Sequence, residues 1–223
     1  DPDNLRPDEL IEKYSVNVQL IRTDLSVEED IVIIEELIKK NDKIEVLVNN
    51  AGYLDGKPFL KNQPAKLEQM IRVHINSPVR FVHAILPNMI SKGRGVIINV
   101  SSLAAFTPFP GYAMYPSTKL FHIGFTESLH ITLRENGIKC QVLCPGFVYT
   151  NFHNRGGVDL SQFRMKRLIR WKTPDEVVKI SVNNLKRKNK VIVVPGFANK
   201  MTRMLSLIIP RRIYYSLADR YLR

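Results

Sequence analysis

Short apolar runs alternate with longer helical patterns along this chain, and this order constrains the fold more than any other feature. The runs typical of strands are residues 17–22, 44–50, 95–102, 138–146 and 190–196. The patterns typical of helices are residues 26–41, 64–91, 112–136 and 174–188. Strands that alternate with helices pair in parallel through right-handed crossovers. We therefore predict an open α/β sheet in a single domain over residues 1–197.

Several helix boundaries are marked by residues that commonly occur there. Ser26 precedes a group of acidic residues and is the predicted N-cap of the first helix. Thr173 and Pro174 form an N-cap and N1 pair for the last one. Pro78 lies inside the long 64–91 pattern, where it should disturb the helix and free a nearby backbone carbonyl.

Composition excludes several classes of protein. The chain has 223 residues, two cysteines and a formal net charge of +12. On one strand, Cys140 and Cys144 would lie about 13 Å apart at ~3.3 Å per residue, which is too far for a disulfide bond. No apolar run reaches the ~18 residues of a membrane-spanning helix, and no signal peptide is visible. We predict a cytoplasmic protein, with no metal-ligating cluster around the cysteines.

Positive charge gathers at the C-terminal end, where residues 186–223 hold ten basic residues and one acidic residue. A predicted extension, residues 198–223, carries apolar residues at helical spacing. These residues are Met201, Met204, Leu205 and Ile208. Such a helix can pack on the protein or a partner subunit, or can attach weakly to an anionic membrane. A solvated basic face is a further reading, whereas nucleic-acid binding is disfavoured because aromatic residues do not alternate with the basic ones.

One Tyr-x-x-x-Lys pair stands in a helical pattern and the other does not. Tyr115 and Lys119 share a helix face at this spacing. Pro116 predicts that the regular helix begins close to Tyr115, and the alternative is a kink in a helix that starts nearer Gly111. Tyr53 and Lys57 have the same spacing, but the surrounding glycine and proline predict a loop. A cation near a phenol favours the phenolate, so we expect Lys119 to lower the pKa of Tyr115. A tyrosine tuned in this way can exchange a proton with a carbonyl or alcohol oxygen.

Four motifs occur in an order that carries a family resemblance. They are VLVNNAG (46–52), INVSS (98–102), YPSTK (115–119) and CPGFVYT (144–150). Together they resemble the short-chain dehydrogenase/reductase family over about residues 17–200. The resemblance implies a doubly wound, Rossmann-like fold. It also implies hydride transfer between a nicotinamide cofactor and a lipophilic carbonyl or alcohol substrate. The cofactor would be NADP or NAD, with NADP favoured. The alternative is a catalytically silent nucleotide-binding regulator or scaffold.

The same resemblance implies roles for individual residues. Tyr115 would be the general acid, Ser102 would orient the substrate oxygen, and Lys119 would tune Tyr115 and hold the nicotinamide ribose. Asn76 would hold a water in a proton relay. The implied cofactor-binding residues, besides Tyr115 and Lys119, are Asp24, Leu25, Asn50, Ala51, Gly52, Pro145, Gly146, Val148 and Thr150. Asp24 could instead cap the following helix, and the five histidines are interpreted as structural or surface residues.

Two regions depart from the family or leave its substrate open. The family begins with a strand and a glycine-rich turn, and about forty residues of that expected fold have no counterpart here, so we expect the chain to be incomplete at its N-terminus. Residues 151–173 form a long connection of the kind that often binds substrate. Its candidate pocket residues are Phe152, Phe163, Met165 and Leu168, with Arg155, Arg164, Lys166 and Arg167 among them. The resemblance also implies a homo-oligomer, a dimer or a tetramer.

Overall fold

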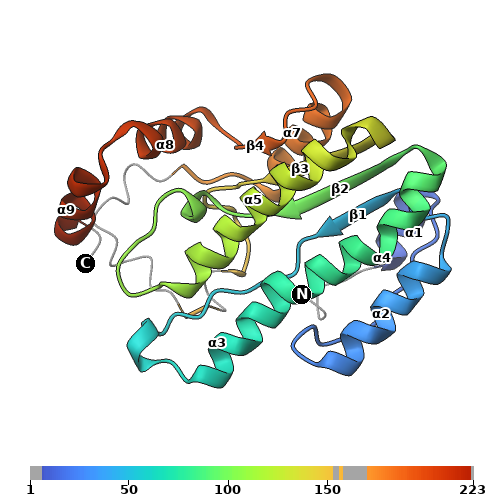
Figure 1. Ribbon diagram of the computed structural model, residues 1–223, viewed down its shortest axis with the longest axis horizontal. Helices are drawn as coiled ribbons and strands as arrows, with labels where there is room; N and C mark the ends of the chain where they lie inside the picture. The colour runs from blue at the N-terminus through green and yellow to red at the C-terminus, as the bar shows by residue number, and fades with distance from the viewer. Residues whose placement is uncertain (1–6, 153–155, 158–169, 222–223) are drawn as a thin grey trace.

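Four parallel strands form the centre of the fold, as the alternating pattern predicts (Figure 1). The computed structural model describes residues 7–152, 156–157 and 170–221. The strands are β1 (Val46–Asn49), β2 (Gly95–Val100), β3 (Ile138–Leu143) and β4 (Ile192–Val193). They lie side by side in sequence order, and each neighbouring pair is parallel. Their carboxyl ends therefore meet at one edge of the sheet.

The strand predicted for residues 17–22 is wrong. Residues 15–24 have no regular secondary structure, and Leu20 and Ile21 are exposed. An alternating pattern becomes a strand only where a neighbouring strand accepts its hydrogen bonds. Within the described ranges, β1 pairs with β2 alone, and residues 17–22 do not pair with its open outer edge.

Helices fill the connections between the strands. They are α1 (Pro7–Tyr14), α2 (Glu28–Lys40), α3 (Pro64–Ile71), α4 (Ser77–Lys92), α5 (Met114–Leu133), α7 (Pro174–Arg187), α8 (Phe197–Ile208) and α9 (Arg211–Tyr221). Short helical turns are η2 (Phe59–Lys61), η4 (Leu103–Ala105) and η5 (Arg134–Asn136). The capping box of Thr173 and Glu176 confirms the predicted start of α7. The predicted cap of α2 is wrong by one residue, because its N-cap is Val27, without a side-chain hydrogen bond, rather than Ser26.

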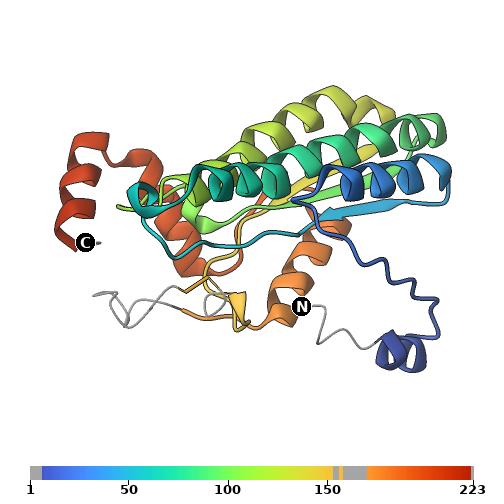
Figure 2. The ribbon, with the colours of Figure 1, turned by 90° about the horizontal axis from the view of Figure 1, so that it is seen from below.

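The two faces of the sheet are covered unequally. Helices α2, α4 and α5 lie across one face, where they bury the largest apolar cluster, including Ile31, Ile85 and Ile97 (Figure 2). Helix α7 lies on the other face and packs Val177 against β3 and β4. Among the described residues, Val48 of β1 remains 51% exposed on that face. The fold is a doubly wound α/β sheet whose second helical layer is partial in the described residues.

Residues 64–92 form one long helix with an irregular turn in its middle. Between α3 and α4 lies a π-helical turn, η3 (Arg72–Asn76), in which the Ser77 N–H donates to the carbonyl of Arg72. Pro78 follows directly and has no N–H for the carbonyl of His74, four residues earlier. The predicted disturbance of this helix is confirmed, and it lies beside the sheet edge where the predicted site residues gather.

Candidate active site

Three strand ends and one helix start converge at the carboxyl edge of the sheet. The segment that follows β2 is tied to the segment that follows β3, since Leu103 N–H donates to the carbonyl of Pro145 over 2.8 Å. Helix α5 begins at Met114, so Pro116 lies in its first turn, as predicted. This start places Tyr115 and Lys119 on the buried side of α5, next to the end of β2.

Tyr115 and Ser102 form the first contact of the site. The Tyr115 side chain is buried, and its phenol is hydrogen-bonded to the Ser102 side chain. The Ser102 hydroxyl also accepts the Ala104 N–H over 3.1 Å, which fixes its direction. Burial raises the pKa of Tyr115 to about 12, although the Ser102 hydrogen bond acts in the opposite direction. At neutral pH this phenol is therefore a proton donor.

Lys119 lies beneath Tyr115 without lowering its pKa. Its Nζ is 5.8 Å from the centroid of the Tyr115 ring and donates to the carbonyl of Val100 over 3.0 Å. Burial lowers the pKa of this ammonium to about 8. The predicted sign for Tyr115 is thus wrong in this structure, because desolvation of the phenolate outweighs the Ser102 hydrogen bond that lowers the pKa.

His74 belongs to the site, although its sequence context gave no reason to select it. It is fully buried in η3, and its ring centroid lies 6.1 Å from that of Tyr115. Its Nε2 accepts the Tyr53 N–H over 3.0 Å, so the ring proton is on Nδ1, 2.9 Å from the Thr118 hydroxyl. That hydroxyl in turn donates to the Tyr115 carbonyl over 3.0 Å. One imidazole thus links the turn after β1 to the first turn of α5.

The surroundings of His74 keep it neutral. Burial lowers its pKa to about 2, and the charge of Lys119 contributes in the same direction. His122, one turn beyond Thr118 on α5, is also buried, and burial lowers its pKa to about 4. A hydrogen bond with the backbone of His74 opposes that shift. His74, whose carbonyl receives no N–H from Pro78, is therefore in contact with α5.

Gly52 makes room for both of these side chains. A Cβ atom at this position would lie 3.1 Å from His74 Nε2 and 3.3 Å from Lys119 Nζ. Both distances are tighter than ordinary contacts, so any larger residue would displace the imidazole or the ammonium. The glycine of the NNAG motif therefore has a packing role in addition to its predicted place beside a cofactor.

A second polar chain crosses the core behind the site. Asn49 and Asn99 are register partners on β1 and β2, and Asn49 Nδ2 donates to Asn99 Oδ1 over 2.8 Å. Asn99 Nδ2 donates to the Thr126 hydroxyl over 2.9 Å, which connects the chain to α5. An asparagine inside an apolar strand pattern is the sequence signal that could have indicated these hydrogen bonds, because buried amides need partners.

The predicted residues before and after β1 lie mostly at the surface. Asp24 is exposed, and its Oδ1 accepts the Ser26 N–H over 2.8 Å. This hydrogen bond lowers the pKa of Asp24 and uses the carboxylate in the turn before α2. Leu25 packs against the main apolar cluster. Asn50 and Ala51 follow β1 and are exposed at the site edge.

Asn76 and the residues after β3 complete the predicted set. Asn76 is exposed at the end of η3, so its relay role stays a prediction, while His74 is the η3 side chain beside Tyr115. Pro145 holds the β2 end through its carbonyl, and a Cβ on Gly146 would lie 2.7 Å from Asn199 Nδ2 of α8. Val148 forms a parallel bridge with Lys172, and Thr150 is exposed.

Phe152 is the described member of the predicted substrate pocket. Its ring lies 5.9 Å from that of Tyr115, and it belongs to the apolar group around Leu54 and Met70. The other predicted pocket residues lie outside the described ranges. They are Arg155, Phe163, Arg164, Met165, Lys166, Arg167 and Leu168. Tyr53 and Lys57 lie in a loop, as predicted.

Metal-binding groups, membrane-spanning helices and cysteines also bear on the class of site. Within residues 7–152, 156–157 and 170–221, no group of three or more His, Cys, Asp or Glu side chains could hold a metal ion. In the same ranges no helix is long and apolar enough to cross a bilayer. Cys140 and Cys144 are both buried, with free thiols.

Comparison with known proteins agrees with this arrangement. Residues 5–157 match the family described as short chain dehydrogenase. The chain is 31% identical to 17-beta-hydroxysteroid dehydrogenase type 3 from Rattus norvegicus, covering 89% of this chain and 62% of that protein. It is 31% identical to the 3-oxoacyl-acyl-carrier-protein reductase FabG from Aquifex aeolicus, covering 78% of this chain and 71% of the relative. Of other curated relatives, the chain spans about half to three fifths.

A solved structure shows the same fold. The short-chain dehydrogenase from Sphingobium yanoikuyae, in complex with NADPH, superposes with a TM-score of 0.79 at 23% identity. The match covers 94% of this chain and 80% of that one. At this identity the likeness establishes the doubly wound fold.

Proposed function

The chain belongs to the short chain dehydrogenase family, and we propose that the full-length protein transfers a hydride between a nicotinamide cofactor and a carbonyl or alcohol substrate. The observation that carries the proposal is the group of buried Tyr115 and Lys119 with half-buried Ser102 at the carboxyl edge of a parallel sheet. Ligands of open α/β sheets bind at that edge. A phenol, a hydroxyl that touches it and an ammonium below it are the groups that proton transfer to a carbonyl oxygen requires.

The chain's own residues supply the proton and the orientation. Tyr115, protonated at neutral pH because burial raises its pKa to about 12, donates to the substrate oxygen during reduction. Ser102, already hydrogen-bonded to that phenol, binds the same oxygen and fixes its position. Phe152 shields the phenol from water on one side. In the oxidative direction Tyr115 accepts the proton, which needs the positive field of a charged Lys119.

The described residues fit a nicotinamide cofactor. The Lys119 ammonium has three donors, and its hydrogen bond to the Val100 carbonyl uses one of them, which leaves capacity for a ribose hydroxyl. Exposed Asn50 and Ala51 let a ligand approach the backbone after β1, and Gly146 provides a second small position after β3. When bound, the cofactor supplies the hydride. We propose NADP as this cofactor, with NAD as the outcome that an assay must distinguish.

The substrate class we propose is a lipophilic ketone or a 3-oxoacyl compound. The aromatic ring of Phe152 beside Tyr115 favours an apolar substrate. The relatives named for hydroxysteroids and for 3-oxoacyl groups are consistent with it. We also propose that the protein is cytoplasmic. We propose that it forms a homo-oligomer, because Leu120 and Ile131 of α5 are 53% and 67% exposed and leave an apolar surface on this helix. A catalytically silent nucleotide-binding regulator is the alternative function, but such a regulator would not require Ser102, Tyr115 and Lys119 together.

Turnover of the full-length protein on a carbonyl panel, with NADPH and NADH in parallel, tests the proposal. Tyr115→Phe removes the proton donor and should lower kcat on the order of 10²–10⁴-fold while cofactor affinity is kept. Tyr112→Phe is the matched control, since Tyr112 precedes the same helix and its hydroxyl bonds to the carbonyl of Gly56 over 3.2 Å. Near-normal turnover in Tyr115→Phe would remove this mechanism, and tight cofactor binding without turnover on any substrate would favour the regulator.

A further inference from the structure

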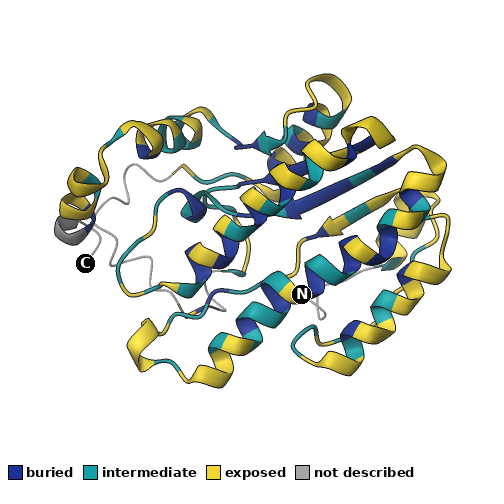
Figure 3. Cartoon of the chain, in the orientation of Figure 1, coloured by how far each residue is buried: buried dark blue, intermediate teal, exposed yellow. Residues whose placement is uncertain are grey.

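Helix α8 has its apolar side in solvent and its polar side toward the protein. Leu207 and Ile208 are 65% and 68% exposed, and Met204 and Leu205 are exposed beside them. Ser206 is buried on the opposite side. A helix on a globular core normally has the reverse arrangement, with the apolar stripe inward. The apolar stripe predicted from the sequence therefore exists as a helix but is directed outward (Figure 3).

Three inward polar side chains of α8 donate to backbone carbonyls of their own segment, whereas the buried Arg203 Nε has no hydrogen-bond partner among the described residues. Asn199 donates to the carbonyl of Pro195 over 2.7 Å, and Thr202 donates to that of Ala198 over 3.1 Å. Ser206 donates to the carbonyl of Arg203 over 2.7 Å, and the Arg203 guanidinium lies 5.3 Å from the centroid of the Phe106 ring. The three hydrogen bonds close within the segment of α8 itself, Arg203 contacts Phe106 of the neighbouring loop, and the apolar side stays available.

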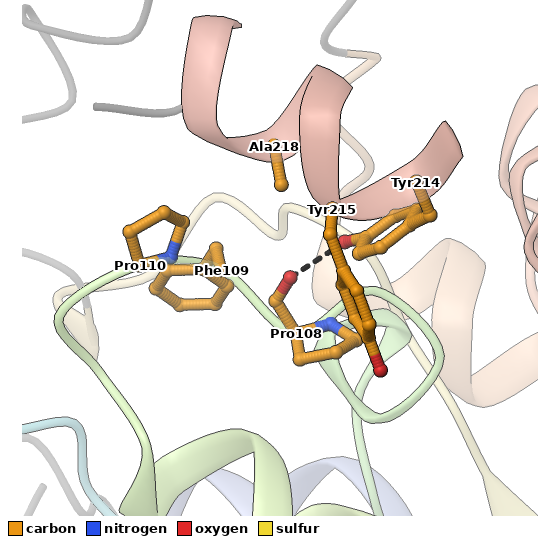
Figure 4. A pocket seen from close by; sticks show the side chains of 6 residues that line it. All are labelled: Pro108, Phe109, Pro110, Tyr214, Tyr215 and Ala218. Atoms are coloured by element: carbon orange, nitrogen blue, oxygen red, sulfur yellow. Dashed lines mark hydrogen bonds between the residues drawn. The ribbon is translucent and has the colours of Figure 1, made fainter. Parts of the chain in front are cut away.

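Helix α9 extends the same outer surface. Ile213 and Leu217 are exposed, whereas Tyr215, also exposed, lies over a pocket beside Pro108 (Figure 4). The helix is held by Tyr214, whose hydroxyl donates to the Pro108 carbonyl over 2.6 Å (Figure 4). Around this bond, Phe109, Pro110 and Ala218 line this shallow pocket between α9 and the loop after η4. We call the exposed apolar residues of α8 and α9, with their neighbouring cations, the α8–α9 surface.

The charge of this surface selects among its potential occupants. Residues 192–218 contain four basic residues, Lys200, Arg203, Arg211 and Arg212, and no acidic residue. All but Arg203 are exposed. A second copy of the chain would bring two positive surfaces together, which repulsion opposes. An anionic bilayer offers both an apolar layer for the leucines and isoleucines and negative headgroups for the cations.

We propose that the α8–α9 surface binds peripherally to anionic membranes, with Leu207 and Ile208 inserted among the lipids and Arg211 and Arg212 at the headgroups. The surface adjoins the catalytic edge through Asn199, which lies against Gly146, and through Tyr214, which bonds to the loop after Ser102. If the proposed dehydrogenase function holds, membrane binding brings the substrate side of the site close to dissolved lipophilic ketones.

Vesicle co-sedimentation of the full-length protein tests the surface separately from catalysis. Vesicles of phosphatidylcholine alone are compared with vesicles that also contain phosphatidylserine, at low and high salt. We expect binding to the anionic vesicles that weakens at high salt. The double variant Leu207→Ser, Ile208→Ser should weaken this binding about tenfold or more, since each buried methylene contributes roughly 0.8 kcal/mol.

Two further variants complete the test. Arg211→Gln, Arg212→Gln should weaken binding about tenfold or more and reduce its dependence on salt, because two cations at the anionic headgroups are lost. Val178→Ser, at an exposed apolar position of α7 (58% exposed, against 68% for Ile208), is the control and should bind like the unaltered protein. The proposal fails if anionic vesicles bind no better than neutral ones, or if the α8 variant binds like the control. Self-association that the α8 variant abolishes, without vesicle binding, would assign the surface to a second copy instead.

Discussion

Helices α5 and α8 both direct polar side chains toward the protein and leave apolar side chains outside, yet they do so for different reasons. In α5 the buried side includes Thr118, Lys119 and Thr126, while Leu120 and Ile131 are exposed. In α8 the polar side holds Asn199, Thr202 and Ser206, all with hydrogen bonds to backbone carbonyls of the same segment. The two helices therefore have similar patterns of polar and apolar residues, and they differ in the hydrogen-bond partners of their polar side chains.

The partners of the α5 side chains belong to distant parts of the chain. Thr118 contacts His74 of η3, Lys119 binds the carbonyl of Val100 on β2, and Thr126 accepts from Asn99. Each of these contacts fixes the geometry of one strand end or turn around Tyr115. Inward polar side chains that hydrogen-bond to other elements, as in α5, therefore indicate a site. Inward polar side chains that hydrogen-bond only within their own segment, as in α8, accompany an opposite side that is free to bind a partner.

The largest expected effect comes from breaking the α5 side of the comparison at Lys119. Lys119→Met in the full-length protein should lower turnover about 100-fold and also weaken cofactor binding, because this ammonium serves both the phenol and the ribose. Steady-state kinetics and cofactor titration measure the two losses. Lys139→Met is the control, since Lys139 also donates to a carbonyl, that of Leu185, but at the surface. Unchanged kinetics and affinity would remove Lys119 from the site.

Stability separates this loss of activity from unfolding. Burial lowers the pKa of Lys119 from 10.5 to about 8, so the unfolded chain binds the proton more tightly between these values. The free energy of unfolding of the unaltered protein should therefore rise with pH across that window. Lys119→Met should lack this rise. A variant that is inactive, fully folded and without the alkaline rise would show that the ammonium is present for function at a cost in stability.

An acid dependence of about 2 kcal/mol is expected from His74. Its pKa is about 2 in the fold and near 6.5 when unfolded, so the unfolded state gains protons first and stability falls as pH drops below about 6.5. Between pH 7.5 and 5.0 this single group accounts for about 2 kcal/mol, at 1.36 kcal/mol per pKa unit. Urea unfolding at the two pH values, with His74→Gln beside the exposed control His83→Gln, measures it. Equal acid losses in both variants would contradict the assignment.

Much of the fold could be predicted from sequence, and the reasons for the failures are physical. Four of the five predicted strands, the long helices and the start of α5 at Met114 follow from local periodicity and proline chemistry. The strand at 17–22 failed because pairing depends on a neighbour that the segment itself does not encode. The outward stripe of α8 could not be assigned, since periodicity gives the existence of an apolar side and not its direction.

The site shows the same division. The motifs identified Ser102, Tyr115 and Lys119, which the fold brings together. Sequence reasoning chose Asn76 on η3 and missed His74, because a π turn changes which side chains of a helix point inward. It also gave the wrong sign for the Tyr115 pKa, since the burial that dominates this shift is a property of the packed structure.

A smaller effect, about 1–2 kcal/mol, is expected where α5 meets His74. Thr118→Val keeps the shape of the side chain but leaves the buried Nδ1–H of His74 without its acceptor, which costs stability. Thr132→Val is a matched control on the same helix, because the Thr132 hydroxyl bonds only within α5, to the carbonyl of Ser128, and is exposed. Chemical denaturation should show the loss for Thr118 alone, and kcat should fall with it if His74 positions Tyr115. Equal stabilities of the two variants would mean that the imidazole finds another acceptor.

The smallest effect sharpens the comparison from the side of α8. Thr202 resembles Thr118 in donating to a carbonyl of its own helix, that of Ala198, over 3.1 Å. This hydrogen bond stays within α8, unlike the contact of Thr118 with His74, so Thr202→Val should change the free energy of unfolding by no more than about 0.5 kcal/mol. Because the outer apolar side is unchanged, vesicle binding should also stay the same. A loss as large as that of Thr118→Val would show that the polar side of α8 is tied into the body of the protein as firmly as α5 is, and the distinction between a helix that builds a site and one that presents a surface would then fail.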